Sequence, residues 1–264
     1  MKLSKQNVMM RLDLTRSRTA DMLLGAAFAL VVCASHAFAL GGDAVSETGG
    51  RLERHVIMVH GTKGNTCTGT VLSPTVVITA AHCVTGSSQY AVSYKEGDSP
   101  VLQEVREVAR HPNFKASSTV SVDVALIRMR VPLPPRFSPV ALDDPSNATD
   151  DNGVGSQQTI AGFGLSREGD EKTLGTLRAA PVTVLPRFYP RFFRLGRNGS
   201  DLLICKGDSG GPVLNEALFG LTLTGVIYAS EKSSNGRQCG DKAQAVRIAP
   251  QRRWIDGVMA RWQN

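Results

Sequence analysis

Apolar residues in this chain occur in short runs separated by Gly, Pro, Ser and Asn, and this pattern predicts strands rather than helices. Aromatic residues are few, while Gly and Pro are frequent. The best-marked strands are predicted over residues 70–72, 75–80, 123–129, 157–161, 212–215, 221–229 and 243–248. We therefore expect an all-β fold.

The end of the chain has a different periodicity. Between Pro250 and Gln263, apolar side chains recur at helical spacing, at Trp254, Ile255, Val258, Met259 and Trp262. These positions share one face of a predicted C-terminal helix, over about residues 250–263. We interpret that face as core packing rather than as a ligand site.

A proline-rich stretch predicts where the domain divides. Residues 132–152 contain five prolines followed by acidic residues and Asn, a composition typical of a linker. The 264 residues are enough for one large or two small cores. We find no low-complexity tract and no internal repeat clear enough to use.

The first 39 residues read as a targeting segment. Five Lys and Arg residues precede an apolar run, Met22 to Ala34, which is too short to span a bilayer comfortably. Small residues at Ala37 and Ala39 suit signal peptidase, so we predict a signal peptide over 1–39, cleaved after Ala39. A single membrane anchor is the alternative. Lipidation at Cys33 is disfavoured by the bulky Val32 before it.

Charge limits the classes of partner. Removing residues 1–39 takes away five basic and two acidic residues, so the formal charge falls from +7 to +4. No Lys or Arg run interleaved with aromatic residues is present, which argues against a nucleic-acid partner. We expect a secreted (extracellular or periplasmic) protein without stable membrane association after the signal is removed.

Cysteine usage agrees with export. Four cysteines remain after residue 39, and three pairings are open to them: Cys67, Cys83, Cys205 and Cys239. Their spacing contains no Cys-x-x-Cys pair, which disfavours zinc. We predict no metal and no cofactor.

Three polar residues in distant segments suggest nucleophilic catalysis. His82 lies in Thr79–Cys83, just past a predicted strand end, and Ser209 lies in the glycine-rich turn Gly207–Pro212. A serine hydroxyl needs a base within hydrogen-bond reach, and the base needs an orienting carboxylate. Asp123 stands alone among apolar residues, where an acid is costly to bury without a partner such as an imidazole.

The order of these residues decides between two reaction frameworks. Residues 207–211 also match the G-x-S-x-G turn of α/β-hydrolases, which requires a histidine after the serine. All five histidines precede Ser209, so that reading has no base. The order His82, Asp123, Ser209 instead matches the chymotrypsin order. We assign His55, His60 and His111 to the surface or to ordinary packing.

On these motifs, together with Cys67–Thr70 and Ala161–Gly164, the chain resembles the trypsin/chymotrypsin-like serine endopeptidases from Gly41 to its C-terminus. The resemblance implies two antiparallel six-stranded β-barrels packed side by side, with the active site in the cleft between them. Within a domain over 40–264, we expect the barrels at about 53–131 and 153–249. Protein or peptide substrates and a monomeric state are the corresponding expectations.

The resemblance also implies a role for each matching residue. Ser209 would attack the scissile carbonyl, His82 would carry its proton, and Asp123 would orient His82. The backbone N–H groups of Gly207 and Ser209 would form the oxyanion hole. The implied disulfides are Cys67–Cys83 and Cys205–Cys239.

Asp208 matches a buried aspartate that pairs with the free mature N-terminus in this family. The family's zymogens are cut before Ile-Val-Gly-Gly, which is absent here, and the nearest match is Leu40-Gly41-Gly42. We hypothesise that signal peptidase exposes Leu40, whose ammonium then inserts beside Asp208. The alternative is an Asp208 that is satisfied internally.

Substrate preference departs from that of trypsin. Where cleavage after Arg or Lys needs an acid on the pocket floor, this chain has Leu203, with Ile204 beside it. We predict a preference for uncharged, apolar side chains, unless Asp201 or Asp241 enters the pocket. In the pocket wall, where the family usually has Ser-Trp-Gly, this chain has Tyr228-Ala229-Ser230. The serine hydroxyl that normally helps to hold the aspartate matching Asp123 is therefore missing. A non-catalytic binding protein and an esterase of the same fold are the competing functions.

Overall fold

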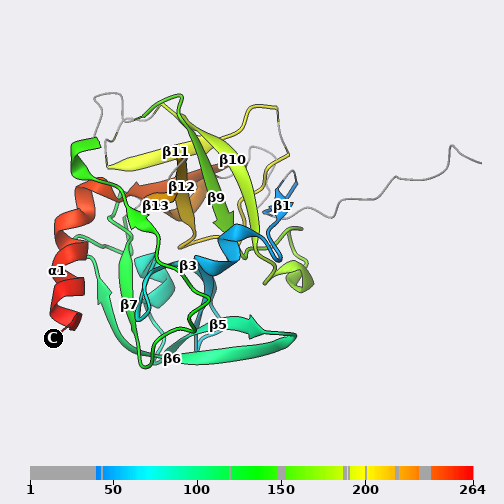
Figure 1. The fold of residues 1–264 in the computed structure, drawn as a ribbon. Helices are drawn as coiled ribbons and strands as arrows, with labels where there is room; N and C mark the ends of the chain where they lie inside the picture. Colours follow the sequence, from blue (N-terminus) through cyan, green and yellow to red (C-terminus); the bar gives the residue numbers. More distant parts are fainter. Residues whose placement is uncertain are drawn as a thin grey trace, which may run out of the picture. The chain divides into compact units, whose positions relative to one another are not determined.

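Strands dominate the computed structural model, which describes residues 40–263 except 43, 119, 148–152, 187–188, 190, 200, 218–219 and 232–238. The predicted signal peptide lies outside the described residues. The strands are β1 Val45–Ser46, β2 Val56–Gly61, β3 Thr66–Ser73, β4 Val76–Thr79, β5 Tyr90–Glu96, β6 Ser99–Arg110, β7 Ala125–Met129, β8 Ala141–Leu142, β9 Gln157–Gly162, β10 Arg178–Leu185, β11 Phe192–Gly196, β12 Pro212–Ala217, β13 Gly220–Glu231 and β14 Lys242–Arg247. One α-helix, α1 Arg252–Gln263, follows them (Figure 1).

Short 3-10 helices connect several of these strands. They are η1 Arg51–Arg54, η2 Ala81–Val84, η3 Pro145–Asn147, η4 Glu171–Thr173 and η5 Ala249–Gln251. Of these, η2 is the one that carries a predicted site residue, His82.

The first barrel closes in the order β2-β3-β4-β7-β6-β5, with every pairing antiparallel. Its interior is filled by aliphatic side chains such as Val71, Val77 and Leu126, all fully buried. β6 is long, and its register shifts between Val105 and Glu107, where it turns from β5 toward β7. A bulge of this kind bends a strand and helps a small sheet to close.

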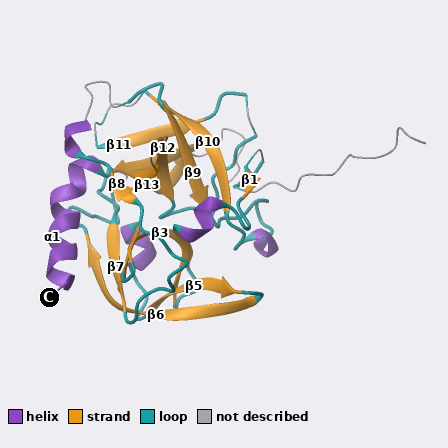
Figure 2. Cartoon of the chain, viewed as in Figure 1, coloured by secondary structure: helices purple, strands orange, loops and turns teal. Residues whose placement is uncertain are grey.

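The second barrel closes through β9, β10, β11, β14, β13 and β12, again with antiparallel pairing. Two short strands extend this sheet: β1 pairs antiparallel with β10, and β8 pairs parallel with β13. The expected fold class, two six-stranded antiparallel barrels with a C-terminal helix, is thus confirmed. Figure 2 shows that strands make up most of the regular structure.

Hydrogen bonds from β3 hold the two barrels together beside the serine turn. Thr68 Oγ1 donates to the carbonyl of Gly207 at 2.8 Å, and its backbone N–H donates to the carbonyl of Ser209 at 2.8 Å. The same hydroxyl accepts the N–H of Phe163 at 3.0 Å. Thr68 is fully buried, so these bonds satisfy groups that water cannot reach.

The helix α1 packs as its spacing predicts. Ile255, Val258 and Trp262 are buried in the main hydrophobic cluster, and Trp254 and Met259 pack against it. Arg128 of β7 donates a hydrogen bond to the carbonyl of Trp262 at 2.5 Å, which ties the helix to the first barrel. Among the described residues, no helix is both long and apolar enough to cross a bilayer.

Two disulfides join distant segments, in the pairing that the resemblance implies. Cys67–Cys83 links β3 to η2, and Cys205–Cys239 links the serine turn to the segment before β14. The bridged cysteines are 16 and 34 residues apart. Loops of these lengths correspond to roughly 3 to 4 kcal/mol of stabilisation each in the chain-entropy model.

Candidate active site

His82 lies in η2, which connects β4 to β5 of the first barrel. β4 ends at Thr79, and the chain enters η2, whose Ala81, Cys83 and Val84 are buried. The disulfide to Cys67 and a 2.7 Å hydrogen bond from Thr85 Oγ1 to the carbonyl of Ala81 hold this turn. The His82 side chain remains 40% exposed. The sequence therefore buries the backbone around His82 and leaves its ring accessible.

Asp123 makes two hydrogen bonds to His82. Its Oδ2 lies 2.7 Å from His82 Nδ1, and its Oδ1 accepts the backbone N–H of His82 at 2.8 Å. The Asp123 side chain is only 11% exposed, just before β7. Because a carboxylate accepts and does not donate, Nδ1 carries a proton, and in the neutral imidazole Nε2 is then the nitrogen with the lone pair.

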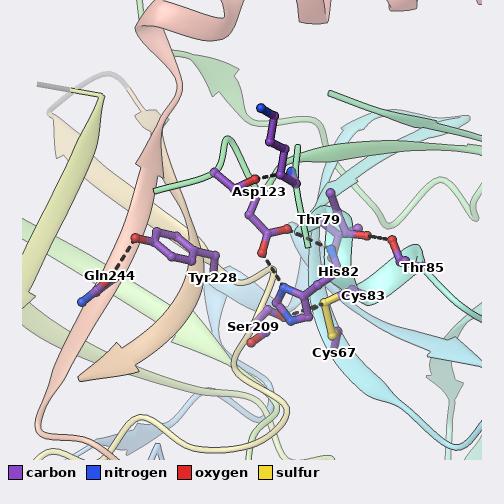
Figure 3. Close-up of polar contacts among 12 residues, drawn as sticks. Cys67, Thr79, His82, Cys83, Thr85, Asp123, Ser209, Tyr228 and Gln244 are labelled. Atoms are coloured by element: carbon purple, nitrogen blue, oxygen red, sulfur yellow. Dashed lines mark hydrogen bonds and ion pairs between the residues drawn. A yellow bond between two sulfur atoms is a disulfide. The ribbon is translucent and has the colours of Figure 1, made fainter. Parts of the chain in front are cut away.

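Ser209 lies on the other side of the imidazole. Figure 3 shows its side chain beside the His82 ring, with the Asp123 carboxylate against the opposite edge. The Cys67–Cys83 disulfide lines the same place, since Cys83 Sγ lies 3.6 Å from His82 Nε2 and 3.7 Å from the carbonyl of Ser209. The three residues predicted from the sequence are thus brought together from three segments.

The turn before Ser209 leaves two backbone donors without a partner. In the described part of the chain, no hydrogen bond engages the N–H of Gly207 or of Ser209. Gly207 has φ +102°, and a Cβ there would come within 2.7 Å of Gly164 Cα. Only glycine fits this conformation without strain. Two free N–H groups next to a serine hydroxyl can donate hydrogen bonds to a bound oxygen on which negative charge develops.

Asp208 is fully buried directly behind this turn. Its Oδ1 accepts the N–H of Gly164, and its Oδ2 accepts the N–H of Cys205, both at 2.9 Å. Burial raises the pKa of this carboxyl to about 7, against the lowering effect of these donors and of the Arg178 charge. The sequence singled out Gly164 only as the last residue of the Ala161–Gly164 motif, and it did not single out Arg178.

The segment Leu40–Gly42 packs into the core of the second barrel. Leu40 is fully buried in one cluster with Leu202 and Ile204, and the carbonyl of Gly41 accepts the N–H of Leu203 at 2.9 Å. This segment therefore packs beside Leu202–Ile204, which precede Asp208 in the chain.

A cavity of about 330 Å³ opens beside Ser209. Its apolar lining comes from Leu165, Ile204, Ile227, Ala229 and the Cys205–Cys239 disulfide. Ser230 adds a hydroxyl, while Glu168, Glu171 and Lys206 supply charge. Lys206 Nζ is paired with Glu171 at 2.9 Å.

Two of the predicted pocket residues do not line this cavity. Leu203 packs against the disulfide cluster, next to Gly41. Tyr228 lies where the pairing of β13 with β14 shifts register, and its hydroxyl donates to Gln244 Oε1 at 2.8 Å. Figure 3 shows its ring turned away from His82. Asp201 and Asp241 are exposed, and neither lines the cavity.

The remaining histidines lie outside the site. His55 Nδ1 is bonded to the carbonyl of Ser138 at 2.6 Å, His60 Nε2 to Ser93 Oγ at 2.7 Å, and His111 packs on Trp254. Burial lowers the pKa of all three rings. These contacts agree with the structural roles that we assigned to them.

One cluster has the composition of a metal site but not its chemistry. Cys67, Cys83 and His82 place their side-chain ligand atoms within 4.8 Å of one another. The two cysteines are bonded to each other, and a disulfide offers no thiolate to a metal.

Comparison with known proteins identifies the fold family. A model of the family described as Trypsin matches residues 41–255, most of the chain and all of the site described above. The chain belongs to the trypsin family. This agrees with the family resemblance that the sequence motifs indicate.

Similar proteins of this family come from several animals. Phenoloxidase-activating factor 3 of Holotrichia diomphalia is 29% identical, over 74% of this chain and 64% of that protein. Trypsin zeta of Drosophila melanogaster is 26% identical, over 74% of each chain. Granzyme M of Homo sapiens is 27% identical, over 74% of this chain and 80% of its own length. This chain thus spans slightly less than two thirds of the first of these relatives.

Proposed function

We propose that this trypsin-family chain is a secreted endopeptidase that hydrolyses peptide bonds through an acyl-enzyme on Ser209. The observation that carries the proposal is the row of three side chains, in which Asp123 holds His82 Nδ1 at 2.7 Å and Ser209 lies beside the same ring. This arrangement leaves Nε2 free to accept the serine proton. Isolated serines, histidines and aspartates are common, but nucleophilic catalysis requires all three in contact at a nucleophile that a substrate can reach. Ser209 meets the last condition, because it lines the cavity described above.

The reaction follows from the position of each group. Ser209 Oγ attacks the carbonyl carbon of the substrate while His82 Nε2 takes the hydroxyl proton, and the Asp123 charge stabilises the resulting imidazolium. The oxygen that becomes negative is stabilised by the N–H groups of Gly207 and Ser209. His82 then gives its proton to the leaving amine, and water repeats the sequence to release the acid. The same steps would serve an ester, so esterase activity is a second use of one site.

A fluorophosphonate probe tests the proposal directly. We expect the folded wild-type protein to be labelled covalently at Ser209, because the probe needs an activated hydroxyl and an oxyanion site. A binding protein without catalytic function would leave the probe unreacted. Mass spectrometry of the labelled peptide identifies the serine.

We further propose a preference for uncharged, apolar side chains before the scissile bond. Ile204 and Ile227 line the cavity and are almost fully buried, so a guanidinium there would lose water without gaining a partner. On a panel of tetrapeptide amides, we expect kcat/KM for Leu or Phe to exceed that for Arg by at least about tenfold, which is roughly 1.4 kcal/mol. Selectivity for Arg would contradict this and would instead assign the rim acids Glu168 and Glu171 to substrate binding.

For the mature protein we propose a start at Leu40, after release of a signal peptide over 1–39. The burial of Leu40 beside Ile204 supports this, because a chain that begins there would carry its ammonium into the barrel that holds Asp208. We expect Edman sequencing of the exported active protein to begin Leu-Gly-Gly. A start well downstream of Leu40 would contradict both the cleavage site and the insertion of this terminus.

A further inference from the structure

Two glycines, Gly162 and Gly164, lie against the carboxylate of Asp208. A Cβ on Gly162 would lie 2.3 Å from Asp208 Oδ1, and one on Gly164 would lie 2.4 Å from its Cγ. The carboxylate therefore occupies the space that side chains at these two positions would fill. Its neighbours on this side are backbone groups of β9 and of the loop that follows.

Arg178 projects onto the same face as this carboxylate. In the antiparallel pairing of β9 with β10, Arg178 stands directly opposite Gly162. Residues directly opposite each other have Cβ atoms about 5 Å apart on the same face of the sheet. Since the Cβ direction of Gly162 leads to Asp208 Oδ1, the Arg178 side chain leaves the sheet toward the same buried region.

The guanidinium of Arg178 is itself buried and only partly hydrogen-bonded. The residue is 9% exposed, and Nη1 donates to the carbonyls of Thr173 and Thr176 at 3.4 and 2.9 Å. Its Nε is buried without a partner among the described residues. Within that part of the chain, no hydrogen bond joins Arg178 to Asp208, so the two charges interact through space. A buried cation with incomplete hydrogen bonding is costly unless a charge compensates it.

We propose that Arg178 is an internal counter-cation for Asp208, which holds the Gly207–Ser209 turn in its active conformation even in the uncleaved chain. It is a positioning residue, since it acts through Asp208 and does not reach the reacting atoms. The inference rests on the proposed function of Ser209. Release of Leu40 then adds a second cation to a carboxylate that already has one, so cutting would increase activity rather than create it.

The electrostatics agree with this assignment. Among the described charged groups, Arg178 is the one whose charge lowers the pKa of the Asp208 carboxyl. The other elements packed against Asp208 contribute only the backbone N–H groups of Gly164 and Cys205, and Cys205 is in a disulfide. Burial lowers the pKa of Arg178, and the Asp208 charge acts against this lowering.

The sign of the effect on stability follows by linkage. Folding raises the Asp208 pKa from 3.8 to about 7, so the native state binds this proton more tightly than the unfolded chain does. The contribution is full below pH 3.8 and is lost as the pH rises through about 7. Without the Arg178 charge the native pKa would be higher still, and the loss of stability would continue above pH 7.

The test compares Arg178→Lys with Arg178→Gln in the full 264-residue chain, refolded under oxidising conditions with residues 1–39 retained. Both variants keep a hydrogen-bond donor that can serve the carbonyls of Thr173 and Thr176, but only the Lys variant keeps the positive charge. We expect the wild type and the Lys variant to hydrolyse an apolar tetrapeptide amide within about threefold of each other. We expect the Gln variant to lose about fivefold in kcat/KM at pH 7, because the acid limb of its pH–activity profile should lie about one pH unit higher.

A second measurement does not depend on activity. Between pH 7 and 8, the Tm of the Gln variant should continue to fall, while that of the Lys variant should be nearly constant. Arg247→Gln is the matched control, since Arg247 is also buried but lies over the ring of Phe193. Arg247→Gln should alter Tm without shifting the acid limb of the profile of kcat/KM against pH.

Two outcomes would overturn the inference and leave the proposed function intact. One is equal pH profiles and equal Tm slopes for the Lys and Gln variants. The other is an inactive full chain when the exported chain is active and labelled at Ser209. If neither form is labelled at Ser209, the proposed function fails and the inference fails with it.

Discussion

Replacing Ser209 with alanine is expected to lower kcat by roughly 10⁶-fold, with little change in KM. The variant keeps the His82–Asp123 pair and the Gly207 turn, because neither depends on the serine hydroxyl. It loses the only atom in this row that can form the acyl bond. Burst and steady-state hydrolysis of a tetrapeptide amide measures the loss, and the fluorophosphonate probe should no longer react.

The control for this variant is Ser146→Ala. Ser146 is exposed on η3, where its hydroxyl and its N–H bond to Asp144 Oδ1 far along the chain from the site. Its activity should equal that of the wild type. If Ser209→Ala digested proteins as fast as its parent, another nucleophile would be responsible, and the proposed function would be wrong.

The strands predicted from the sequence are largely buried, whereas the strands that were missed include both exposed and buried ones. β4 and β7 form short, nearly continuous apolar runs, and both were found within a few residues. β5 is mostly half-buried and β6 is mostly exposed, and their side chains are mixed in character. Both strands were missed because neither shows an apolar run or a clean alternation. β2, β10 and β11 were also not predicted. Their pairing depends on partners far away in the chain, which a local pattern does not contain.

The catalytic residues of the candidate site could be predicted because each of them lies in a local sequence motif. His82, Asp123 and Ser209 each carry a recognisable context, and the structure brings the three together. Arg178 carries no such context, since its relation to Asp208 arises only from the register of β10 against β9.

The pocket lining depended on a detail that the sequence does not reveal. The register shift between Ile227 and Ala229 places Tyr228 toward Gln244, while its neighbours on both sides line the cavity. A one-residue irregularity exchanges the two faces of a strand, so counting positions from a motif assigns the wrong side.

Asp123→Asn should lower kcat by about 10⁴-fold while leaving the fold and KM nearly unchanged. The two hydrogen bonds between Asp123 and His82 explain why the loss is so large. Oδ1 of Asp123 accepts the backbone N–H of His82 at 2.8 Å, so the Asn side chain must keep its oxygen at that position. Its NH₂ group then faces His82 Nδ1, at the place of the present 2.7 Å contact.

An NH₂ group in that position donates, and it therefore selects the tautomer of His82 with the proton on Nε2. That nitrogen can no longer accept the proton of Ser209, although no side chain has moved. Asp144→Asn is the matched control, because the same change in an exposed loop should leave kcat as it is. Steady-state kinetics with an amide substrate measures both variants. A loss of less than about tenfold in Asp123→Asn would mean that Asp123 does not select the tautomer of His82.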